Sequence, residues 1–365
     1  MKQLNLPEAL GPELDIRDPI LKKRLEALNL RRGYRLFGRV SFPGLHEIGI
    51  EKKDKADKNR LPLIAFPGLC HGNWSYIRLI EGLSKYSIET SALSPYGESQ
   101  SKTFDKPIEE LTLEDYIIPY QSYLSRIDAE VVLMGHSLGA LLALKLKERM
   151  KDQIGGLIIL GGVKPSNMCS RTYSFSEEAG VIWKPIEHPE WINDDLFQGD
   201  FPPEIKWFRQ KICESIGSNN VLDDYRGDHG KVDPNAIDCP ILEFVGERDV
   251  DETTGIMNEI THVIEITDEL KKKIGEKLEP ESEGGEKVEE ILVIKEPVCK
   301  NRFIEKASLV QGQRLSIADF FRKYGQCPYG ETHIIPDGTH DGILLGRQAD
   351  QVAAAIGKNY RDFFG

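Results

Sequence analysis

The stretch VVLMGHSLGALLALKLKERM, residues 131–150, holds a serine between two glycines. The apolar run before the serine is typical of a buried strand, and the segment after it, 140–150, repeats apolar residues at helical spacing. Gly135 and Gly139 stand two residues on either side of Ser137 and let the backbone turn tightly without side-chain clashes. The stretch therefore predicts a strand, a sharp turn at Ser137 and a helix.

Strand-like and helix-like segments alternate on both sides of this stretch. Such alternation predicts an α/β fold, with a mostly parallel, doubly wound sheet, right-handed crossovers and helices on both faces. Ligands then gather at the carboxyl ends of the strands. The predicted strands are 34–42, 45–53, 61–66, a short one within 88–97, 130–135, 155–163, 239–246 and 332–338, and the predicted helices are 74–86, 112–127 and 140–150.

Changes in pattern divide the chain into four predicted parts. They are an N-terminal extension (1–33), an α/β core (34–163 and 239–365), a helical cap (164–238) and an insertion within the core (255–330). The cap segment holds three of the four tryptophans, Trp183, Trp191 and Trp207. Their aromatic rings can form the core of the cap, line an apolar substrate pocket, or do both.

The insertion combines a charged centre with strand-like flanks. In residues 271–290, twelve of the twenty side chains are charged, which is too polar for a self-supporting core and predicts a mobile tip. The flanks 261–267 and 289–297 can pair as a hairpin across a Gly-Gly turn. We expect a solvated decoration, with docking of a partner or of a neighbouring subunit as the alternative.

Composition excludes several classes of protein. The 365 residues carry a formal net charge of −12, which opposes binding to nucleic acid. No apolar run approaches the roughly 20 residues that span a bilayer. Prolines and acids interrupt residues 1–20 before a signal peptide could form, so we expect a cytoplasmic protein without a membrane span. The sequence does not indicate an oligomeric state.

No metal or organic cofactor is expected. The six cysteines are scattered, with no C-x-x-C pair and no Cys/His spacing typical of zinc, so most of them fit small buried residues. Cys70 is interpreted in the same way. A glycine loop that cradles phosphate is also missing from the sequence.

A serine hydroxyl becomes a good nucleophile only when a base removes its proton and a carboxylate orients that base. Asp249 follows the predicted strand 239–246, and His340 follows the predicted strand 332–338. The chain order Ser, Asp, His is the one associated with a G-x-S-x-G turn. We therefore predict that Ser137 is the nucleophile, His340 the base and Asp249 the acid.

Each assignment has an alternative. Ser137 could be a structural turn residue. Asp251 or Glu252 could replace Asp249, and His333 could replace His340, although THII at 332–335 is more typical of a buried strand than of a loop. His71 and His136 flank the site, and we expect them to pack against it or to support it.

These motifs resemble the α/β-hydrolase fold superfamily, over residues 34–250 and 331–362. The resemblance rests on GHSLG, VGERD, GTHDG and FPGLCHGNWSY, the last with Pro67 where the family more usually has histidine. It implies that the backbone N–H groups of Leu69 and Leu138 form an oxyanion hole. The effect of Pro67 on the hydrogen bonds of that loop is open.

The resemblance implies hydrolysis of a carboxylic ester, thioester or amide through an acyl-enzyme, on a small-molecule apolar acyl substrate. Relatives that cleave haloalkanes or epoxides carry aspartate at the turn, where this chain has serine. Two alternatives stay open. One is acyl transfer or carbon–carbon bond hydrolysis by the same triad, and the other is a binding protein that has lost turnover.

Overall fold

A computed structural model describes the parts of the chain on which all structural statements below rest. These are residues 23, 34–41, 45–52, 61–68, 71–94, 106, 110–168, 173–175, 182–183, 217–218, 221, 224, 228–247, 288–291, 297–299, 302–310 and 316–365.

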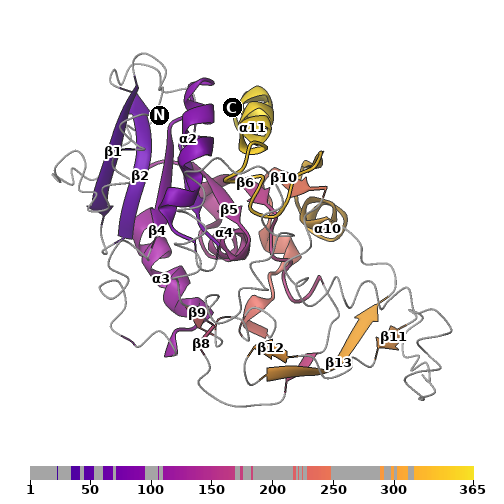
Figure 1. The fold of residues 1–365 in the computed structure, drawn as a ribbon. Coiled ribbons are helices and arrows are strands. Elements are labelled where there is room, and N and C mark those ends of the chain that lie inside the picture. Colours follow the sequence, from indigo (N-terminus) through magenta and orange to yellow (C-terminus); the bar gives the residue numbers. More distant parts are fainter. Residues whose placement is uncertain are drawn as a thin grey trace.

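An eight-stranded sheet forms the centre of the structure (Figure 1). Its strand order is β1-β2-β4-β3-β5-β6-β10-β14. The strands are β1 (Tyr34–Ser41), β2 (Leu45–Lys52), β3 (Leu63–Phe66), β4 (Thr90–Ser94), β5 (Val131–His136), β6 (Ile154–Leu160), β10 (Ile241–Gly246) and β14 (Gly330–Ile335).

The sheet is parallel except at β2, which pairs antiparallel with both β1 and β4. The central strands β3 and β5 are buried along their whole length, which explains their unbroken apolar sequences. The mostly parallel sheet predicted from the alternating pattern is therefore confirmed.

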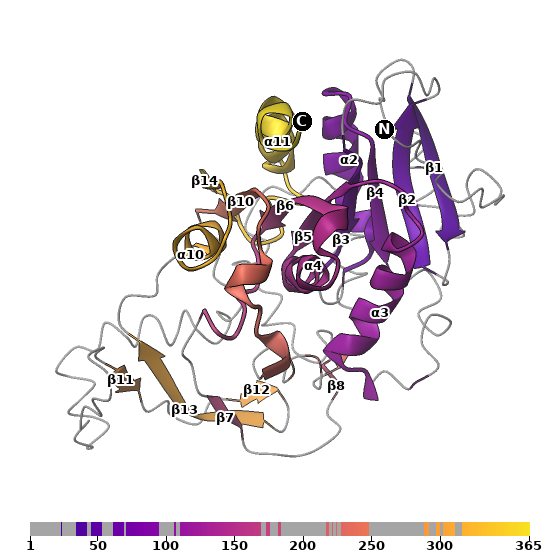
Figure 2. The same ribbon diagram turned by 180° about the vertical axis from the view of Figure 1, so that it is seen from behind.

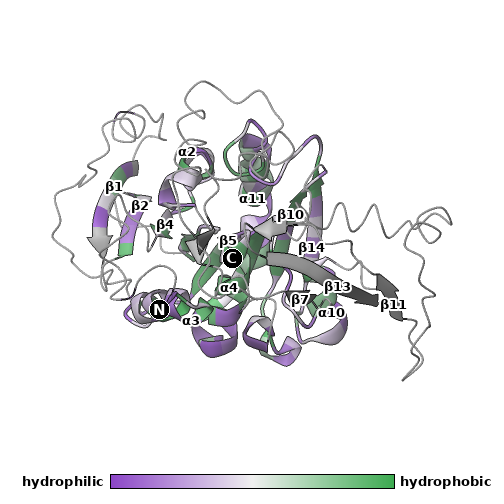
Figure 3. Cartoon of the chain, turned by 60° about the horizontal axis from the view of Figure 1, so that its bottom comes forward, coloured by the Kyte–Doolittle hydropathy of each residue, from purple (hydrophilic) through white to green (hydrophobic). Residues whose placement is uncertain are grey.

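Helices cover both faces of the sheet, and each face has its own apolar core (Figures 1 and 2). Successive residues of β5 alternate between the two cores, because side chains of a strand point to opposite faces. Hydrophobic residues concentrate on the central strands, as Figure 3 shows. The helices are α2 (Ile77–Ser84) and α11 (Ala349–Phe364) on one face, and α3 (Leu113–Leu124), α4 (Leu138–Arg149) and α10 (Ile317–Tyr324) on the other.

Strand β3 lies between β4 and β5, so the chain leaves β3 toward one side and later returns on its other side. In a parallel sheet, such a reversal separates the loops that follow the two central strands and opens a crevice at their carboxyl ends. The loop after β3 and the turn after β5 are neighbours there, because Phe66 pairs in register with Gly135.

Polar side chains cap α3 and α10, which lie on the same face of the sheet. Thr112 and Asp115 form a capping box at the start of α3. Glu243, on β10, is buried, and its carboxylate accepts hydrogen bonds from the backbone N–H groups of Ile317 and Ala318 at the start of α10 (3.2 and 2.9 Å). These amides have no partner within the helix, so Glu243 ties α10 to the sheet.

The described residues of the predicted cap include three short strands. They are β7 (Tyr173–Phe175), β8 (Ile182–Trp183) and β9 (Gly217–Ser218). Most of 164–238 lies outside the described residues, as does all of the extension 1–33 except residue 23.

The described part of the insertion forms β11 (Val288–Ile291), β12 (Pro297–Cys299) and β13 (Arg302–Val310). The strand-like flank at 289–297 contributes to β11, but its partner is β13, and β13 also pairs with β7. The other flank, 261–267, and the centre of the insertion lie outside the described residues. Helix α10 packs on the sheet, so the core resumes at Ser316, before the boundary at residue 330 that the sequence suggested.

Within the described part of the chain, no helix combines the length and apolar character that a membrane crossing requires.

Candidate active site

The turn at Ser137 joins β5 to α4 in a conformation that non-glycine residues rarely adopt. Its φ is 58° and its ψ is −124°, outside the common allowed regions. Three backbone hydrogen bonds hold it: the N–H of Ser137 donates to Leu160 (3.0 Å), and its carbonyl accepts from Ala140 (3.0 Å) and Val163 (3.1 Å). Backbone strain that is held in place in this way is common at functional sites.

The glycines around the turn are required by close contacts. A Cβ on Gly135 would collide with the carbonyl oxygen of Gly139, and a Cβ on Gly139 would collide with that of Phe66. A Cβ on Gly68, in the loop after β3, would lie 2.7 Å from the Cβ and 3.0 Å from the Oγ of Ser137. The loop after β3 therefore runs directly beside the serine side chain.

Of the two predicted oxyanion donors, one is described. Leu138 is the first residue of α4, where backbone N–H groups have no partner within the helix. Leu69 lies outside the described residues. On either side of it, the N–H of His71 donates a hydrogen bond to the carbonyl of Gly68 (3.1 Å).

His340 lies in the loop after β14 and is 4% exposed. Its ring centroid is 4.6 Å from that of His136, and its carbonyl accepts a hydrogen bond from Nε2 of His136 (3.1 Å). Because His136 directly precedes Ser137, this contact brings the predicted base and the predicted nucleophile to one place.

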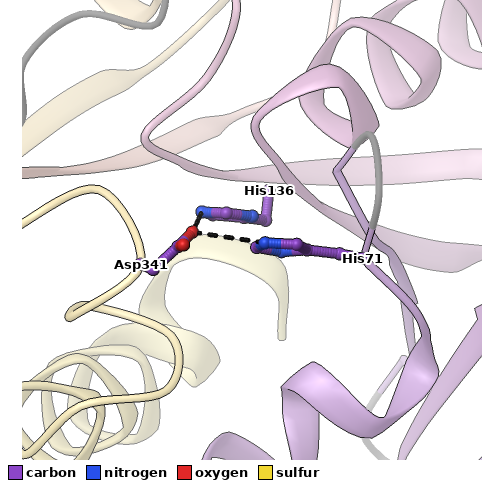
Figure 4. Close-up of side chains that lie close together, drawn as sticks. All are labelled: His71, His136 and Asp341. Atoms are coloured by element: carbon purple, nitrogen blue, oxygen red, sulfur yellow. Dashed lines mark ion pairs between the residues drawn. The ribbon is translucent and has the colours of Figure 1, made fainter. Parts of the chain in front are cut away.

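A buried cluster of His71, His136 and Asp341 lies at the same place (Figure 4). One carboxylate oxygen of Asp341, Oδ1, is 3.5 Å from Nε2 of His71 and 3.6 Å from Nε2 of His136. The two imidazole rings are stacked, with centroids 5.1 Å apart and an interplanar angle of 7°. The three side chains come from the loop after β3, the end of β5 and the loop after β14.

Burial and neighbouring charge set the protonation of this cluster. Burial opposes the charged form of Asp341, but His71, then His340 and His136, outweigh it and lower the pKa of Asp341 to about 2. Burial, together with the His340 and His71 rings, lowers the pKa of His136 well below its usual value, while Asp341 acts in the opposite direction. At neutral pH the cluster therefore holds a carboxylate beside a neutral His136 ring.

The same three side chains are of the type that binds transition metals. Each of the three offers one possible ligand atom, and these three atoms lie within 4.8 Å of one another. Two imidazoles and a carboxylate suit zinc or iron in chemical type.

The remaining predicted site residues are only partly within the described residues. Asp249, the predicted acid, and its alternatives Asp251 and Glu252 lie outside them, as do Trp191 and Trp207. Trp183 belongs to β8, and nothing is described of its side chain.

His333, the alternative base, lies within β14. Its ring stacks on that of Phe244 with centroids 5.1 Å apart, and its Nε2 is 3.0 Å from Glu331. It is therefore held in the sheet, whereas His340 lies in the loop beside the turn.

The sequence interpretation assigned no role to Asp341. The signal was a carboxylate that directly follows the predicted base in GTHDG. His71 and His136 were expected to pack against the site or support it, and the structure places both beside His340 or Asp341.

Comparison by sequence finds two plant relatives, while no protein-family model matches the chain. "Salicylic acid-binding protein 2" of Nicotiana tabacum is 30% identical over 140 residues, which are 38% of this chain and 51% of that protein. "Methylesterase 7" of Arabidopsis thaliana is 22% identical over 158 residues, which are 42% of this chain and 58% of that protein. The chain thus spans only slightly more than half the length of these curated relatives.

Comparison by structure covers nearly the whole chain. Naproxen esterase (carboxylesterase NP) from Bacillus subtilis superposes with a TM-score of 0.51 and 15% identity, covering 93% of this chain and 95% of that one. An N-acyl homoserine lactonase superposes with a TM-score of 0.52 and 14% identity, covering 90% and 97%. At this level of identity, the likeness shows a shared fold.

Proposed function

We propose that this chain, which has the α/β-hydrolase fold, hydrolyses carboxylic esters with Ser137 as nucleophile. The observation that carries the proposal is the strained turn at Ser137, at the carboxyl end of a central strand, with His340 held beside it through His136. A strained turn that holds a serine next to a buried histidine has a clear use in nucleophilic catalysis.

In the proposed reaction, His340 takes the proton of the Ser137 hydroxyl as the oxygen attacks the ester carbonyl. The backbone N–H groups of Leu138 and Leu69 stabilise the oxyanion. His340 then gives the proton to the leaving alcohol, and an acyl-enzyme remains. Water, activated by His340, releases the acid and restores the serine. Asp249 is proposed to orient His340 and to stabilise its imidazolium.

The names of the relatives suggest the class of substrate. One sequence relative is named a methylesterase, and one structural neighbour is named a naproxen esterase and carboxylesterase. We propose a small ester with an apolar acyl group, contacted by Trp183, Trp191 and Trp207 of the cap segment. The large apolar surfaces of these side chains favour such a group.

The test is turnover of p-nitrophenyl acetate, butyrate and octanoate by the wild type and by Ser137→Ala. We expect the variant to lose turnover and labelling by a serine-directed fluorophosphonate. Ser84→Ala is the matched control, because Ser84 is also buried, and its hydroxyl donates to the carbonyl of Glu81 within α2. Labelling that survives in Ser137→Ala, or that is missing from the wild type, would contradict the proposal.

A further inference from the structure

The buried cluster of His71, His136 and Asp341 connects the three segments that carry the proposed catalytic groups. His71 is two residues from Leu69, His136 directly precedes Ser137, and Asp341 directly follows His340. The exposed fractions of the three residues are 6%, 0% and 3%. A buried contact of this kind fixes the segments relative to one another without solvent screening.

Either protons or a metal ion could occupy the space between the three side chains. The distances of 3.5 and 3.6 Å from Asp341 Oδ1 to the two Nε2 atoms are long for hydrogen bonds and are near the ligand spacing around a tetrahedral ion. Distance alone therefore does not decide between them.

The contacts of the imidazoles favour protons. Nε2 of His136 lies 3.1 Å from the carbonyl oxygen of His340, an acceptor, so this nitrogen carries a hydrogen and is not a free ligand. Among the described residues, Oδ1 of Asp341 has no hydrogen-bond partner, and neither have two ring nitrogens, Nδ1 of His71 and Nδ1 of His136. A metal on Nε2 would leave an N–H at both of these buried positions, and metal-bound histidines normally donate that N–H to an acceptor. With the hydrogens on Nε2, each Nδ1 is only an unused lone pair.

We propose that Asp341 is a positioning residue for His340: its buried carboxylate, with Oδ1 3.5 Å from Nε2 of His71 and 3.6 Å from Nε2 of His136, fixes the loop of the base against the nucleophile turn by electrostatic attraction and stabilises the protonated base. This inference rests on the proposed function. No proton leaves or reaches Asp341 during turnover, since it acts as a fixed anion. Burial alone would raise the pKa of Asp341, but His71 and the other two imidazoles lower it. The resulting low pKa agrees with a permanent negative charge.

The sign of the effect on pH dependence follows from the charges at the cluster. Within the described part of the chain, the titratable groups that face Asp341 are His71, His136 and His340. A fixed anion favours the protonated form of His340, so its removal lets His340 lose the proton at lower pH. The acidic limb of kcat/KM reports the base in the free enzyme and should therefore move to lower pH.

The first experiment compares Asp341→Asn with the wild type on a p-nitrophenyl ester across pH 4–9. We expect kcat to fall by about tenfold or more, KM to change by less than about threefold, and the acidic limb to move down by about one pH unit. Glu243→Gln is the matched control, because it also changes a buried carboxylate to an amide. The acidic limb of kcat/KM for this variant should stay at the pH of the wild type. A merely structural role would lower activity without moving the limb.

A second pair of variants tests the tether if Asp341→Asn does not fold. His71→Gln keeps an N–H donor for Asp341, whereas His71→Leu removes it. We expect the Gln variant to keep a kcat several-fold higher than that of the Leu variant. Equal kcat values in this pair would overturn the proposal.

The outcomes separate this inference from the proposed function. A wild type that neither turns over esters nor reacts with a fluorophosphonate contradicts the function itself. If the wild type is active and Asp341→Asn has the same kcat and the same acidic limb of kcat/KM, only the role of Asp341 is overturned. A stoichiometric zinc or iron ion in the purified protein, lost in Asp341→Asn, also overturns it, because the cluster would then be a metal site.

Discussion

Ser137 is held in its unusual backbone conformation by contacts that leave almost no free space. A side chain added at Gly68 or at Gly139, the two glycines that flank it in space, would contact different kinds of atom. A Cβ on Gly68 would press on the Ser137 side chain, whereas one on Gly139 would press on the backbone carbonyls of Phe66 and Pro67. Rotation about χ1 moves the Oγ of Ser137 but not its Cβ, so an alanine at residue 68 must displace the loop after β3 and the serine. An alanine at residue 139 must instead displace the backbone of a central strand, so the two substitutions should have different effects.

We predict that Gly68→Ala folds but reacts poorly, while Gly139→Ala loses stability. In Gly68→Ala, displacement of the serine hydroxyl should slow fluorophosphonate labelling by about 10- to 100-fold. In Gly139→Ala, overpacking should lower the free energy of unfolding by about 1–3 kcal/mol or more. Urea unfolding and labelling rates measure the two effects. Equal labelling of Gly68→Ala and wild type would show that the loop after β3 does not press on Ser137.

At the residue scale, the sequence was informative where chemistry requires a local pattern. G-x-S-x-G and its flanks predicted the turn at Ser137, and the loop position of His340 was predicted from the strand before it. The contact of Asp341 with His71 and His136 could not be predicted, because Asp341 is 205 positions from His136 and 270 positions from His71 in the sequence. Only the strand order brings these segments together.

At the scale of elements, the attachment of α10 to the sheet depends on the buried carboxylate of Glu243. This carboxylate accepts from two helix amides and from the hydroxyl of Thr332 (3.1 Å). Burial raises the pKa of Glu243, and these hydrogen bonds act against that rise. The group is therefore costly to bury and valuable only while its partners are present.

We predict that Glu243→Gln is milder than Glu243→Leu. The amides of Ile317 and Ala318 donate to different carboxylate oxygens, so glutamine keeps an acceptor for one of them and leaves the other N–H facing its NH₂ group. Leucine leaves two buried N–H groups unpaired and should lower the free energy of unfolding by about 2–4 kcal/mol. Thermal or urea unfolding measures the difference. If Leu is no worse than Gln, then α10 is held by its apolar face alone.

Most elements were predicted to within a few residues, because their periodicity is strong. The predicted helix 140–150 is α4 at Leu138–Arg149, and the predicted strand 61–66 is β3 at Leu63–Phe66. The pairing of β11 with β13, and of β13 with β7, was not predicted. Short strands in charged segments carry weak alternation, and their partners are chosen by tertiary contacts.

At the scale of the whole molecule, the cluster ties stability to pH. The pKa of folded His136 lies well below its usual value, so below about pH 6.5 the unfolded chain binds a proton that the folded protein does not. Acidification therefore favours unfolding. The contribution of Asp341, whose folded pKa is about 2, is present above about pH 4 and is lost as the pH falls through about 2.

We predict that the free energy of unfolding of the wild type decreases between pH 7 and pH 5, and that His136→Gln decreases less over the same range. Glutamine cannot take up a proton, so the difference between the two proteins isolates His136 from the other histidines. Urea unfolding at several pH values measures both slopes. Parallel slopes would mean that His136 is protonated to the same extent in the folded and unfolded states.

Helix α11, near the end of the chain, packs on the same face of the sheet as α2, which lies near the start of the core. Tyr360 donates a hydrogen bond to the carbonyl of Leu61 (2.8 Å), Asp350 pairs with Arg78 (2.9 Å), and the residues of α11 share one apolar core with α2. During synthesis on the ribosome, the part of this face that α11 covers stays exposed until residues near 360 have emerged, even after α2 has packed on its own part of the face. The nascent chain thus presents a long-lived apolar surface, which is the kind of surface that chaperones bind, and its folding is completed only after nearly all of the described core has been translated.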